Sequence, residues 1–426
     1  MNVPPAGAGH SDSSETVSRT YRYTVLVMLL LVYIISYVDR QIVGILAIPI
    51  KAELQLTDSQ LGLMGGFAFA IFYTGLGIPI ARLADRFNRA WIIGTSLAIW
   101  SIFTALCGMA NQFVTLFMAR IGVGVGEAGG VAPSYALLSD YFPPHQRGRI
   151  LGIYSLGVPL GSAAGLVVGG YIGQYYGWRA AFLFLGVLGL LLVPVFLFVV
   201  REAPRGRFDG SSSTAEQPSL GDTLSHLRRQ PVFWLASIAT GFGAMMSYGL
   251  TFWLPAYLQR SLHLDLTETA QLLGLTTLIG GSISMVGSGW LADRMSVRNR
   301  RSYALIPFWT TIASLLCLLA ALSMNSIPIV MGLLLATQIF SQAYAPPSIA
   351  LVQSLSPAAM RATTSAIFLL ILNLMGVGLG PFLFGAVSDY FIASYGAEAL
   401  RFAIISCATV CYSLAALLFL VEAQRL

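Results

Sequence analysis

The sequence has few charged residues and few of the residues that usually build catalytic or metal sites. Only 10% of its 426 residues are Asp, Glu, Lys or Arg, and it contains four cysteines, four histidines and one lysine, Lys51. Soluble globular domains have about 25% charged residues, so this composition excludes a soluble fold. The 56% of hydrophobic residues and the mean hydropathy of +0.75 instead indicate a polytopic membrane protein.

Several catalytic and binding classes are excluded by what is missing. The four cysteines all fall inside apolar runs, which leaves no disulfide framework and no metal-ligand spacing. The glycine-rich stretch from Gly122 to Gly130 lacks the preceding strand and the lysine of a phosphate-binding loop. No nucleophile and base are spaced for catalysis. We therefore predict no enzyme activity, no cofactor, no metal and no nucleic-acid partner.

Twelve long apolar runs are present, and each is long enough to cross a bilayer. A hydrocarbon core of about 30 Å needs roughly 20 apolar residues per helix. The sequence therefore predicts an all-α protein with twelve transmembrane helices. The predicted spans lie near residues 24–48, 59–81, 91–110, 113–138, 150–174, 180–200, 231–258, 269–291, 302–323, 327–352, 363–388 and 400–420.

The basic residues predict the orientation, because cytoplasmic loops carry an excess of Lys and Arg. Assigning both tails and the even-numbered loops to one face gives that face eighteen arginines. The opposite face keeps four basic residues, Lys51, Arg179, Arg260 and Arg401. This bias predicts a cell membrane protein, in the inner or plasma membrane, with both termini in the cytoplasm. The first 20 residues are polar, lack the apolar core of a signal peptide, and are predicted to form a disordered cytoplasmic tail.

A polar stretch and an internal repeat predict two six-helix halves. Residues 201–230 read as a cytoplasmic linker between an N-terminal bundle, 21–200, and a C-terminal bundle, 231–426. Within the linker, Leu220 to Arg229 forms a short amphipathic segment. Duplicated halves with a binding site between them are the usual construction of secondary transporters.

Two pairs of matching motifs support the repeat. Leu83-Ala84-Asp85-Arg86 recurs as Leu291-Ala292-Asp293-Arg294, at an offset of 208 residues. Pro133-Ser134 precedes Arg147 by fourteen residues, and Pro347-Ser348 precedes Arg361 by the same number, at an offset of 214. One match could arise by coincidence, but two together favour a duplication.

Four charged residues lie in the middle of predicted spans. Asp39 and Arg40 belong to the first span, and Arg120 and Glu127 belong to the fourth. A charge at the helix centre costs about 2.5–3.5 kcal/mol on insertion scales, so such residues usually face a water-filled cavity, pair with one another and mark an ion or substrate path. Their positions predict transport. The alternative is a static network that only fixes helix register.

The spacing of Arg120 and Glu127 predicts a proton-coupling site. Seven residues are almost two helical turns, about 10.5 Å, so both side chains lie on one face. The glycines between Gly122 and Gly130 permit close helix packing, and we expect the first span to be the neighbour that brings Asp39 close. Burial raises the pKa of a carboxyl group whereas a nearby arginine lowers it, so a carboxylate whose arginine partner moves changes its proton affinity.

The predicted substrate site combines charged residues of the first half with neutral residues of the second. Arg40 points about 100° away from Asp39, and it could bind an anionic substrate group or pair with Glu127. Arg120 and Glu127 are also candidate contacts. A cavity charged on one wall and largely apolar on the other suits an amphipathic molecule. The neutral candidates in the second half are Tyr248, Trp253, Thr276, Gln338, Gln342, Tyr344 and Asn373.

The loop after the second span resembles a family signature. The run Arg82-Leu83-Ala84-Asp85-Arg86-Phe87-Asn88-Arg89 is similar to the loop motif of the major facilitator superfamily, G-x-L-A-D-R-x-G-R-K. Ala81 and Asn88 stand where that motif prefers glycine. The resemblance covers the whole chain and implies two pseudo-symmetric six-helix bundles.

A narrower resemblance implies a substrate class. The run Tyr37-Val38-Asp39-Arg40-Gln41, together with Arg120, Glu127 and Pro133-Ser134-Tyr135, resembles the spinster family of lipid transporters. Proton-coupled sugar-acid and organic-anion carriers also show an Asp-Arg pair in the first span.

The superfamily resemblance also implies cytoplasmic gates. The loop aspartate pairs with neighbouring helix ends and arginines when the cytoplasmic side is closed, and it releases them when that side opens. Charge-assisted hydrogen bonds of about 1.5–3 kcal/mol each could bias two conformations in this way. The alternative is that these arginines only set the orientation. The candidate gating residues are Asp85, Arg86, Arg89 and Arg147 in the first half and Asp293, Arg294 and Arg361 in the second.

The combined prediction is a proton-coupled secondary transporter that works by alternating access. The resemblance implies a lysophospholipid-like or sphingoid-like substrate, with protons and membrane lipids as further partners and a monomeric state. A symporter of sugar acids or other organic anions and a multidrug efflux carrier remain alternatives. So does a receptor or scaffold that keeps the fold, although it would have no need for titratable carboxylates within the membrane.

Overall fold

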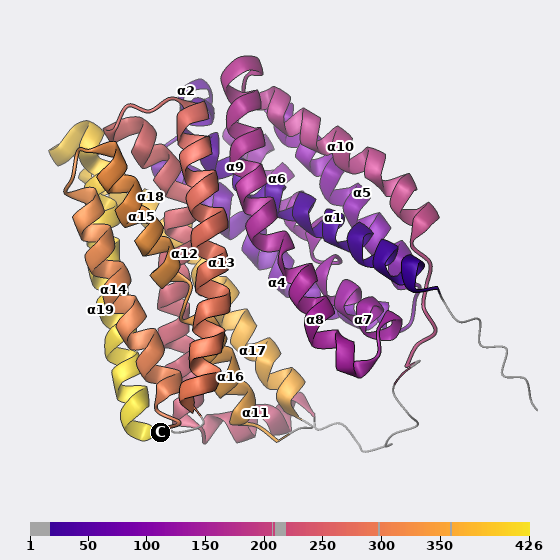
Figure 1. The fold of residues 1–426 in the computed structure, drawn as a ribbon. Helices are drawn as coiled ribbons and strands as arrows, with labels where there is room; N and C mark the ends of the chain where they lie inside the picture. Colours follow the sequence, from indigo (N-terminus) through magenta and orange to yellow (C-terminus); the bar gives the residue numbers. More distant parts are fainter. Residues whose placement is uncertain (1–17, 207, 209–218, 297–298, 358–359) are drawn as a thin grey trace, which may run out of the picture.

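The computed structural model describes residues 18–206, 208, 219–296, 299–357 and 360–426 (Figure 1). Helices account for almost all of these residues, and the described ranges contain no strand. The prediction of an all-α protein is therefore confirmed. Six of the predicted spans form one helix each, whereas the other six form two or three consecutive helical segments.

The first six predicted spans correspond to ten helices and one π-helical segment, η1. They are α1 (Arg19–Ile45), followed by α2 (Ala47–Leu54); α3 (Asp58–Gly62), η1 (Leu63–Phe67) and α4 (Ala68–Ala84); α5 (Arg89–Gly108); α6 (Phe113–Glu127) and α7 (Val131–Tyr141); α8 (Pro144–Ser155) and α9 (Gly157–Tyr176); and α10 (Trp178–Val199). We call α1–α10 the N-terminal set.

The last six predicted spans follow α11 (Leu220–Arg228), which is helical as the amphipathic pattern predicts. They are α12 (Pro231–Ser261); α13 (Leu266–Ser296); α14 (Ser302–Leu322); α15 (Ile327–Ser341) and α16 (Ala345–Ser354); α17 (Arg361–Asn373), the π-helical η3 (Leu374–Leu379) and α18 (Gly380–Tyr395); then the short 3₁₀ turn η4 (Gly396–Glu398) and α19 (Ala399–Arg425). We call α12–α19 the C-terminal set.

Length and hydropathy identify eleven membrane-spanning stretches in the described residues. The last of them, Thr363–Arg425, is 63 residues long and changes direction at Gly396, whose φ of 52° is in the left-handed region that favours glycine. It therefore contains two crossings, α17–α18 and α19, and the total of ten plus two confirms the predicted twelve.

The two sets repeat one backbone feature at an offset of 214 residues. Adding 214 to the bounds of α6 gives those of α15, and the breaks before α7 and α16 also correspond. The Nε of Arg147 donates to the carbonyl of Phe142 over 3.4 Å, and the Nε of Arg361 donates to that of Ser356 over 3.3 Å. These two bonds are related by the same offset. The domain boundaries near residues 200 and 230 stay a prediction.

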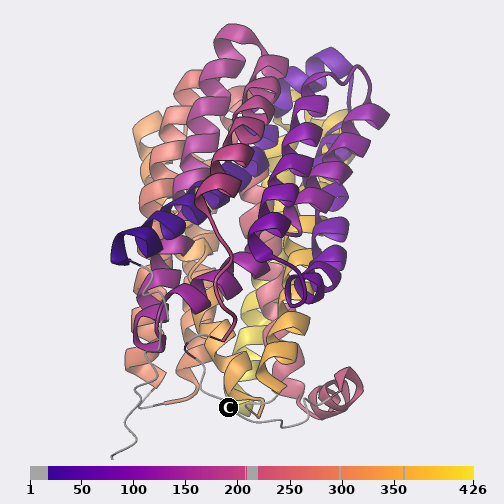
Figure 2. The ribbon, with the colours of Figure 1, turned by 90° about the vertical axis from the view of Figure 1, so that its right-hand side faces the viewer.

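The two sets lie side by side and meet most closely at one end. In Figure 1 the N-terminal set lies on the right and the C-terminal set on the left, with α2 at the upper end and the C-terminus at the lower end. Figure 2 shows the helices from the side, with α11 at the lower end. We call the upper end, which carries Lys51, Arg179, Arg260 and Arg401, the distal end. The lower end is the arginine-rich end.

Hydrogen bonds between the sets hold the distal end closed. The two guanidinium Nη atoms of Arg260 donate to the carboxylate of Asp58 over 2.7 and 2.8 Å, and the Ser388 hydroxyl donates to it over 2.7 Å. The backbone N–H groups of Asp58 and Ser59 donate to the Asp389 carboxylate over 3.0 and 2.7 Å. Further hydrogen bonds at this end run from Gln259 to Ile45 and from Leu266 to Gln174.

Candidate functional site

The first buried ion pair joins the first and fourth crossings. Arg120 Nη1 lies 3.4 Å from Asp39 Oδ2, and the Thr104 hydroxyl of α5 donates to Asp39 Oδ1 over 2.8 Å. All three side chains are buried. The structure therefore brings Asp39 and Arg120 together as the sequence predicts. Thr104 was not predicted, because a single hydroxyl in an apolar run gives no sequence signal.

The second buried ion pair lies beside the first. Arg40 reaches Glu127 Oε2 through Nη2 at 2.7 Å and Nε at 2.8 Å, and the Ser36 hydroxyl donates to the same oxygen over 2.8 Å. Of the two alternatives for Arg40, the structure shows pairing with Glu127. The other carboxylate oxygen, Glu127 Oε1, is buried without a hydrogen-bond partner among the described residues, as is Arg120 Nε. A buried network with such unpaired polar atoms can take up a proton or a ligand atom.

Aromatic rings enclose the Arg40 guanidinium. Its central carbon lies 4.8 Å from the ring centre of Tyr37 and 4.7 Å from those of Phe69 and Tyr73. Cation–π contacts of this kind are worth about 2 kcal/mol or more when desolvated. They hold Arg40 in place beside Glu127 without using its remaining N–H groups.

The glycines of α6 pack against α4 and α5, so the prediction that they face the first span is wrong. A Cβ added to Gly124 would lie 2.7 Å from the carbonyl of Phe69, and one added to Gly126 would lie 2.5 Å from the backbone N of Trp100. The long arginine side chains, rather than close backbone contact, connect the first and fourth crossings.

A pocket of about 50 Å³ lies next to the paired charges and between the two sets. The N-terminal set contributes charged, polar and aromatic side chains, and the C-terminal set contributes a mostly apolar wall. Of the residues that the sequence predicted in the second half, Tyr248 lines this pocket. The lining residues are Tyr37, Arg40, Gln41, Gly44, Gly65, Phe69 and Arg120 from the N-terminal set and Tyr248, Thr251, Phe252, Val377 and Pro381 from the C-terminal set.

The other predicted C-terminal residues lie elsewhere. Trp253 is fully buried and its indole Nε1 donates to the Pro381 carbonyl over 2.7 Å, so it connects α12 to α18 and does not line this pocket. Thr276 and Gln338 line a separate pocket that also contains Thr251. In this structure these residues are therefore separate from the pocket beside Arg40, and their contact with substrate stays a prediction.

Three further predicted positions are at helix ends. Tyr344 is buried beside Gly243 at the start of α16, Gln342 follows the end of α15, and Asn373 is the last residue of α17. None of the three lines the pocket beside Arg40. Phe252, which the sequence analysis did not select, is a pocket residue, since its ring fills the space over Gly65.

Comparison with known proteins decides the family. The sequence profile of the Major Facilitator Superfamily matches residues 29–376, well over half of the chain. The chain belongs to this superfamily. It is a multi-pass membrane transporter, and the predicted fold is confirmed.

Individual members of the superfamily differ in their described roles. The chain is 32% identical over 405 residues to an MFS-type efflux pump of Mycolicibacterium smegmatis, covering 95% of this chain and 93% of that one. It is 27% identical to a probable L-galactonate transporter of Escherichia coli, covering 68% and 65%.

A solved structure supports the spinster resemblance. The crystal structure of a bacterial homolog to the human lysosomal transporter spinster, in an inward-facing and unoccupied conformation, matches with a TM-score of 0.88 and 28% identity. The match covers 96% of this chain and 98% of that one. The chain is thus a spinster-like member of the superfamily.

The superfamily loop after α4 makes contacts that the sequence did not predict. Arg89 is buried, and its Nη1 lies 2.5 Å from Asp140 and its Nε 2.6 Å from Glu202. Asp85 is exposed and makes no ion pair with any described residue. Arg89 therefore pairs with the end of α7 and the segment after α10 instead of Asp85, because those carboxylates approach it when the helices pack.

The remaining gating candidates make local contacts. Arg147 donates to the Ser139 carbonyl over 3.1 Å, and Arg294 lies over the Trp290 ring at 5.4 Å. Arg86 is exposed. The side chain of Asp293 lies outside what the structure describes. Arg361 donates to the carbonyl of Ser356, which lies just after α16. These contacts are at helix ends on the arginine-rich side. The gating role of these residues stays a prediction.

Proposed function

We propose that this transporter is a proton-coupled secondary carrier of an amphipathic lipid, lysophospholipid-like or sphingoid-like, that works by alternating access. We place it in the inner or plasma membrane with both termini in the cytoplasm. The observation that supports this proposal is the pair of buried ion pairs, Asp39–Arg120 and Glu127–Arg40, beside a pocket whose opposite wall is mostly apolar.

The ion pairs provide a physical link between substrate and proton. Arginine keeps its proton in proteins, so an anionic head group that binds Arg40 competes with Glu127 for the same guanidinium. Removing one partner of a buried ion pair costs about 3–5 kcal/mol, because the other charge is left unpaired. Protonation of Glu127 avoids this cost. Substrate binding and proton uptake are therefore coupled.

The apolar wall favours an amphipathic substrate over a sugar acid. Phe252, Val377 and Pro381 offer hydrocarbon surface and few groups that could bind several hydroxyls. The competing proposals are a sugar-acid carrier, like the L-galactonate relative, and an efflux carrier, like the mycobacterial relative. An efflux substrate with a positive charge would be attracted to Glu127 rather than to Arg40.

A flux assay in proteoliposomes with an imposed pH gradient tests the proposal. Wild type should move a lysophospholipid faster than a hexonate or a lipophilic cation. Asp39→Asn and Glu127→Gln should each lower gradient-driven flux at least tenfold, because neither amide takes up a proton. The matched control is Glu268→Gln, since Glu268 is exposed at the start of α13. Unchanged gradient-driven flux in both amide variants would refute proton coupling.

A further inference from the structure

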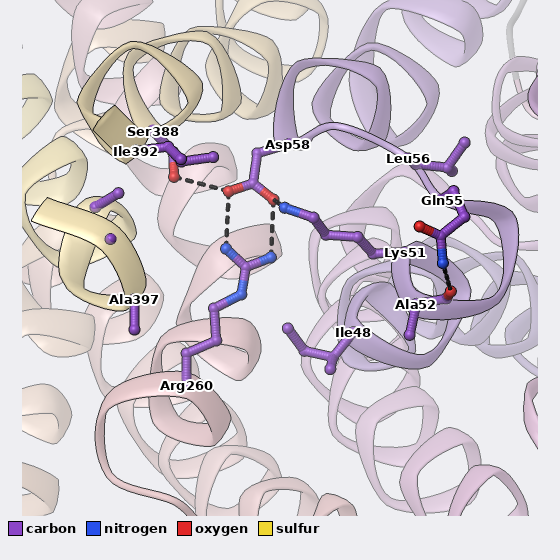
Figure 3. A pocket seen from close by; sticks show the side chains of 12 residues that line it. Ile48, Lys51, Ala52, Gln55, Leu56, Asp58, Arg260, Ser388, Ile392 and Ala397 are labelled. Carbon is purple, nitrogen blue, oxygen red and sulfur yellow. Dashed lines mark hydrogen bonds and ion pairs between the residues drawn. The ribbon is translucent and has the colours of Figure 1, made fainter. Parts of the chain in front are cut away.

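The distal end contains a pocket that is separate from the Arg40 site (Figure 3). Its volume is about 520 Å³, within the roughly 300–1,000 Å³ range of small-molecule sites. No residue lines both pockets. The N-terminal set contributes Ile48, Lys51, Ala52, Gln55, Leu56 and Asp58, and the C-terminal set contributes Arg260, Ser388, Ile392, Gly396, Ala397 and Ala399.

Two cations face this pocket while their shared carboxylate is covered. The Asp58 side chain is 0% exposed, whereas those of Lys51 and Arg260 are 27% and 19% exposed. Asp58 Oδ1 accepts from Lys51 at 2.6 Å and from Arg260 at 2.8 Å, and Oδ2 accepts from Arg260 and Ser388 at 2.7 Å each. Figure 3 shows Arg260 reaching the Asp58 carboxylate from below and Lys51 reaching it from the right.

In this cluster both carboxylate oxygens of Asp58 accept hydrogen bonds, whereas Lys51 and Arg260 have N–H groups that Asp58 does not bind. Both Asp58 oxygens are occupied, and the nearby Asp389 carboxylate accepts from the backbone N–H groups of Asp58 and Ser59. Lysine has three donors and arginine five, whereas Lys51 uses one on Asp58 and Arg260 uses two. The pocket therefore offers spare cationic donors and no free carboxylate, which is suited to an anion.

Apart from Gln55, the rest of the lining is apolar. Ile48 and Leu56 come from the N-terminal set, and Ile392 and Ala397 come from the opposite side of the pocket. We propose that this pocket binds a small amphipathic anion, with its phosphate or carboxylate on Lys51 and Arg260 and its hydrocarbon part against these side chains. A soluble alkyl phosphate and the head group of an anionic phospholipid share this chemistry.

Binding at this position has a conformational consequence. Because both sets line the pocket, it exists only while the distal end is closed. A ligand shifts an equilibrium toward the conformation that it binds better, by a factor of about 100 when its concentration is 100 times the dissociation constant. The ligand therefore holds the distal end shut and inhibits any transport cycle that must open it. This inference does not depend on the identity of the transported substrate.

Thermal unfolding of the purified protein with hexyl phosphate tests the site. We expect saturable protection of the wild type by hexyl phosphate, and none by hexyltrimethylammonium, which has the same chain and the opposite charge. Inorganic phosphate should need at least a tenfold higher concentration. Equal protection by inorganic phosphate, or by the cation, would overturn the proposal.

Variants distinguish ligand binding in the pocket from a change in the hydrogen bonds that close the distal end. Ala52→Trp fills the pocket without removing any Asp58 contact, and it should raise the half-maximal hexyl phosphate concentration at least tenfold. Ala393→Trp is the matched control, because Ala393 is exposed on α18 outside the pocket. Lys51→Gln should weaken binding and Lys51→Arg should preserve it. Wild-type binding in both Ala52→Trp and Lys51→Gln would overturn the assignment.

Nanodiscs distinguish the two sources of the anion. If a phospholipid occupies the pocket, nanodiscs containing phosphatidic acid should protect wild type more than Ala52→Trp and should reduce the effect of hexyl phosphate. If the source is soluble, hexyl phosphate should act equally in neutral and anionic nanodiscs. Both results support the site, whereas no protection by hexyl phosphate or by phosphatidic acid contradicts it.

Discussion

The fourth and tenth crossings have the same backbone and different chemistry. Helices α6 and α7 correspond to α15 and α16 at an offset of 214 residues, with a break at the same place. Arg120 of the N-terminal copy corresponds to Leu334, and Glu127 corresponds to Ser341. All four side chains are buried. The two copies share the helix geometry, and only the N-terminal copy has charges at these two positions.

This difference between the two copies indicates why Arg120 and Glu127 are charged. Each one costs about 2.5–3.5 kcal/mol at the helix centre. The C-terminal copy forms the same two helices and the same break, although it has Leu334 and Ser341 in place of the two charged residues. Charge is therefore not required for this local architecture, which favours a functional role over the alternative of fixing helix register.

The largest expected effect comes from making the N-terminal copy resemble the C-terminal one. Arg120→Leu leaves Asp39 buried with Thr104 as its remaining polar partner, so we expect a loss of about 3–5 kcal/mol of unfolding free energy. Transport should fall below detection. Chemical unfolding in detergent and flux in proteoliposomes measure the two quantities separately.

A double variant separates stability from function. Asp39→Asn combined with Arg120→Leu removes both charges, and replacing a buried ion pair with neutral groups is often neutral or stabilising. The double variant should recover most of the lost stability and none of the proton-driven transport. Recovery of transport together with stability would show that the pair is structural.

The next effect concerns the hydroxyl that supports the pair. Thr104→Val removes the 2.8 Å hydrogen bond to Asp39, and hydrogen bonds to charged groups contribute about 1.5–3 kcal/mol. Thr337 is an equally buried threonine on α15 whose hydroxyl donates to the carbonyl four residues earlier, Leu333. Thr337→Val should therefore cost about 1 kcal/mol or less. Equal losses in the two variants, measured by chemical unfolding, would contradict the special position of Thr104.

The crossings could be predicted from sequence because bilayer thickness imposes a minimum length on each apolar run. The predicted starts at residues 231, 302 and 327 agree with α12, α14 and α15. The largest disagreement at a helix end is at α18, which continues to Tyr395 although the prediction ended at 388. Aromatic residues at that end continue the helix beyond the strongly apolar run.

The site could be predicted only in part. Charges inside apolar runs identified Asp39, Arg40, Arg120 and Glu127, because a charge at bilayer depth is costly and usually serves a function. The pairing of Arg89 with Asp140 and Glu202 could not be predicted, since it depends on how the ends of separate helices converge. Neutral residues such as Trp253 and Phe252 were assigned poorly, because the same side chain serves packing or a pocket according to helix rotation.

The smallest expected effect tests the packing difference between the two copies. Gly126→Ala places a methyl group 2.5 Å from the Trp100 backbone nitrogen, so α6 must move away from α5, at a cost of about 1–3 kcal/mol. Gly332 is a glycine of α15 that is not equivalent to Gly126, and a Cβ added to it would have nothing within 4 Å. Gly332→Ala should therefore stabilise by about 0.4–1 kcal/mol through reduced freedom of the unfolded chain. Opposite signs in chemical unfolding are expected. Gly126→Ala should also slow transport, because moving the end of α6 shifts Glu127 relative to Arg40. If the variant loses stability but keeps full transport, the second ion pair tolerates this displacement.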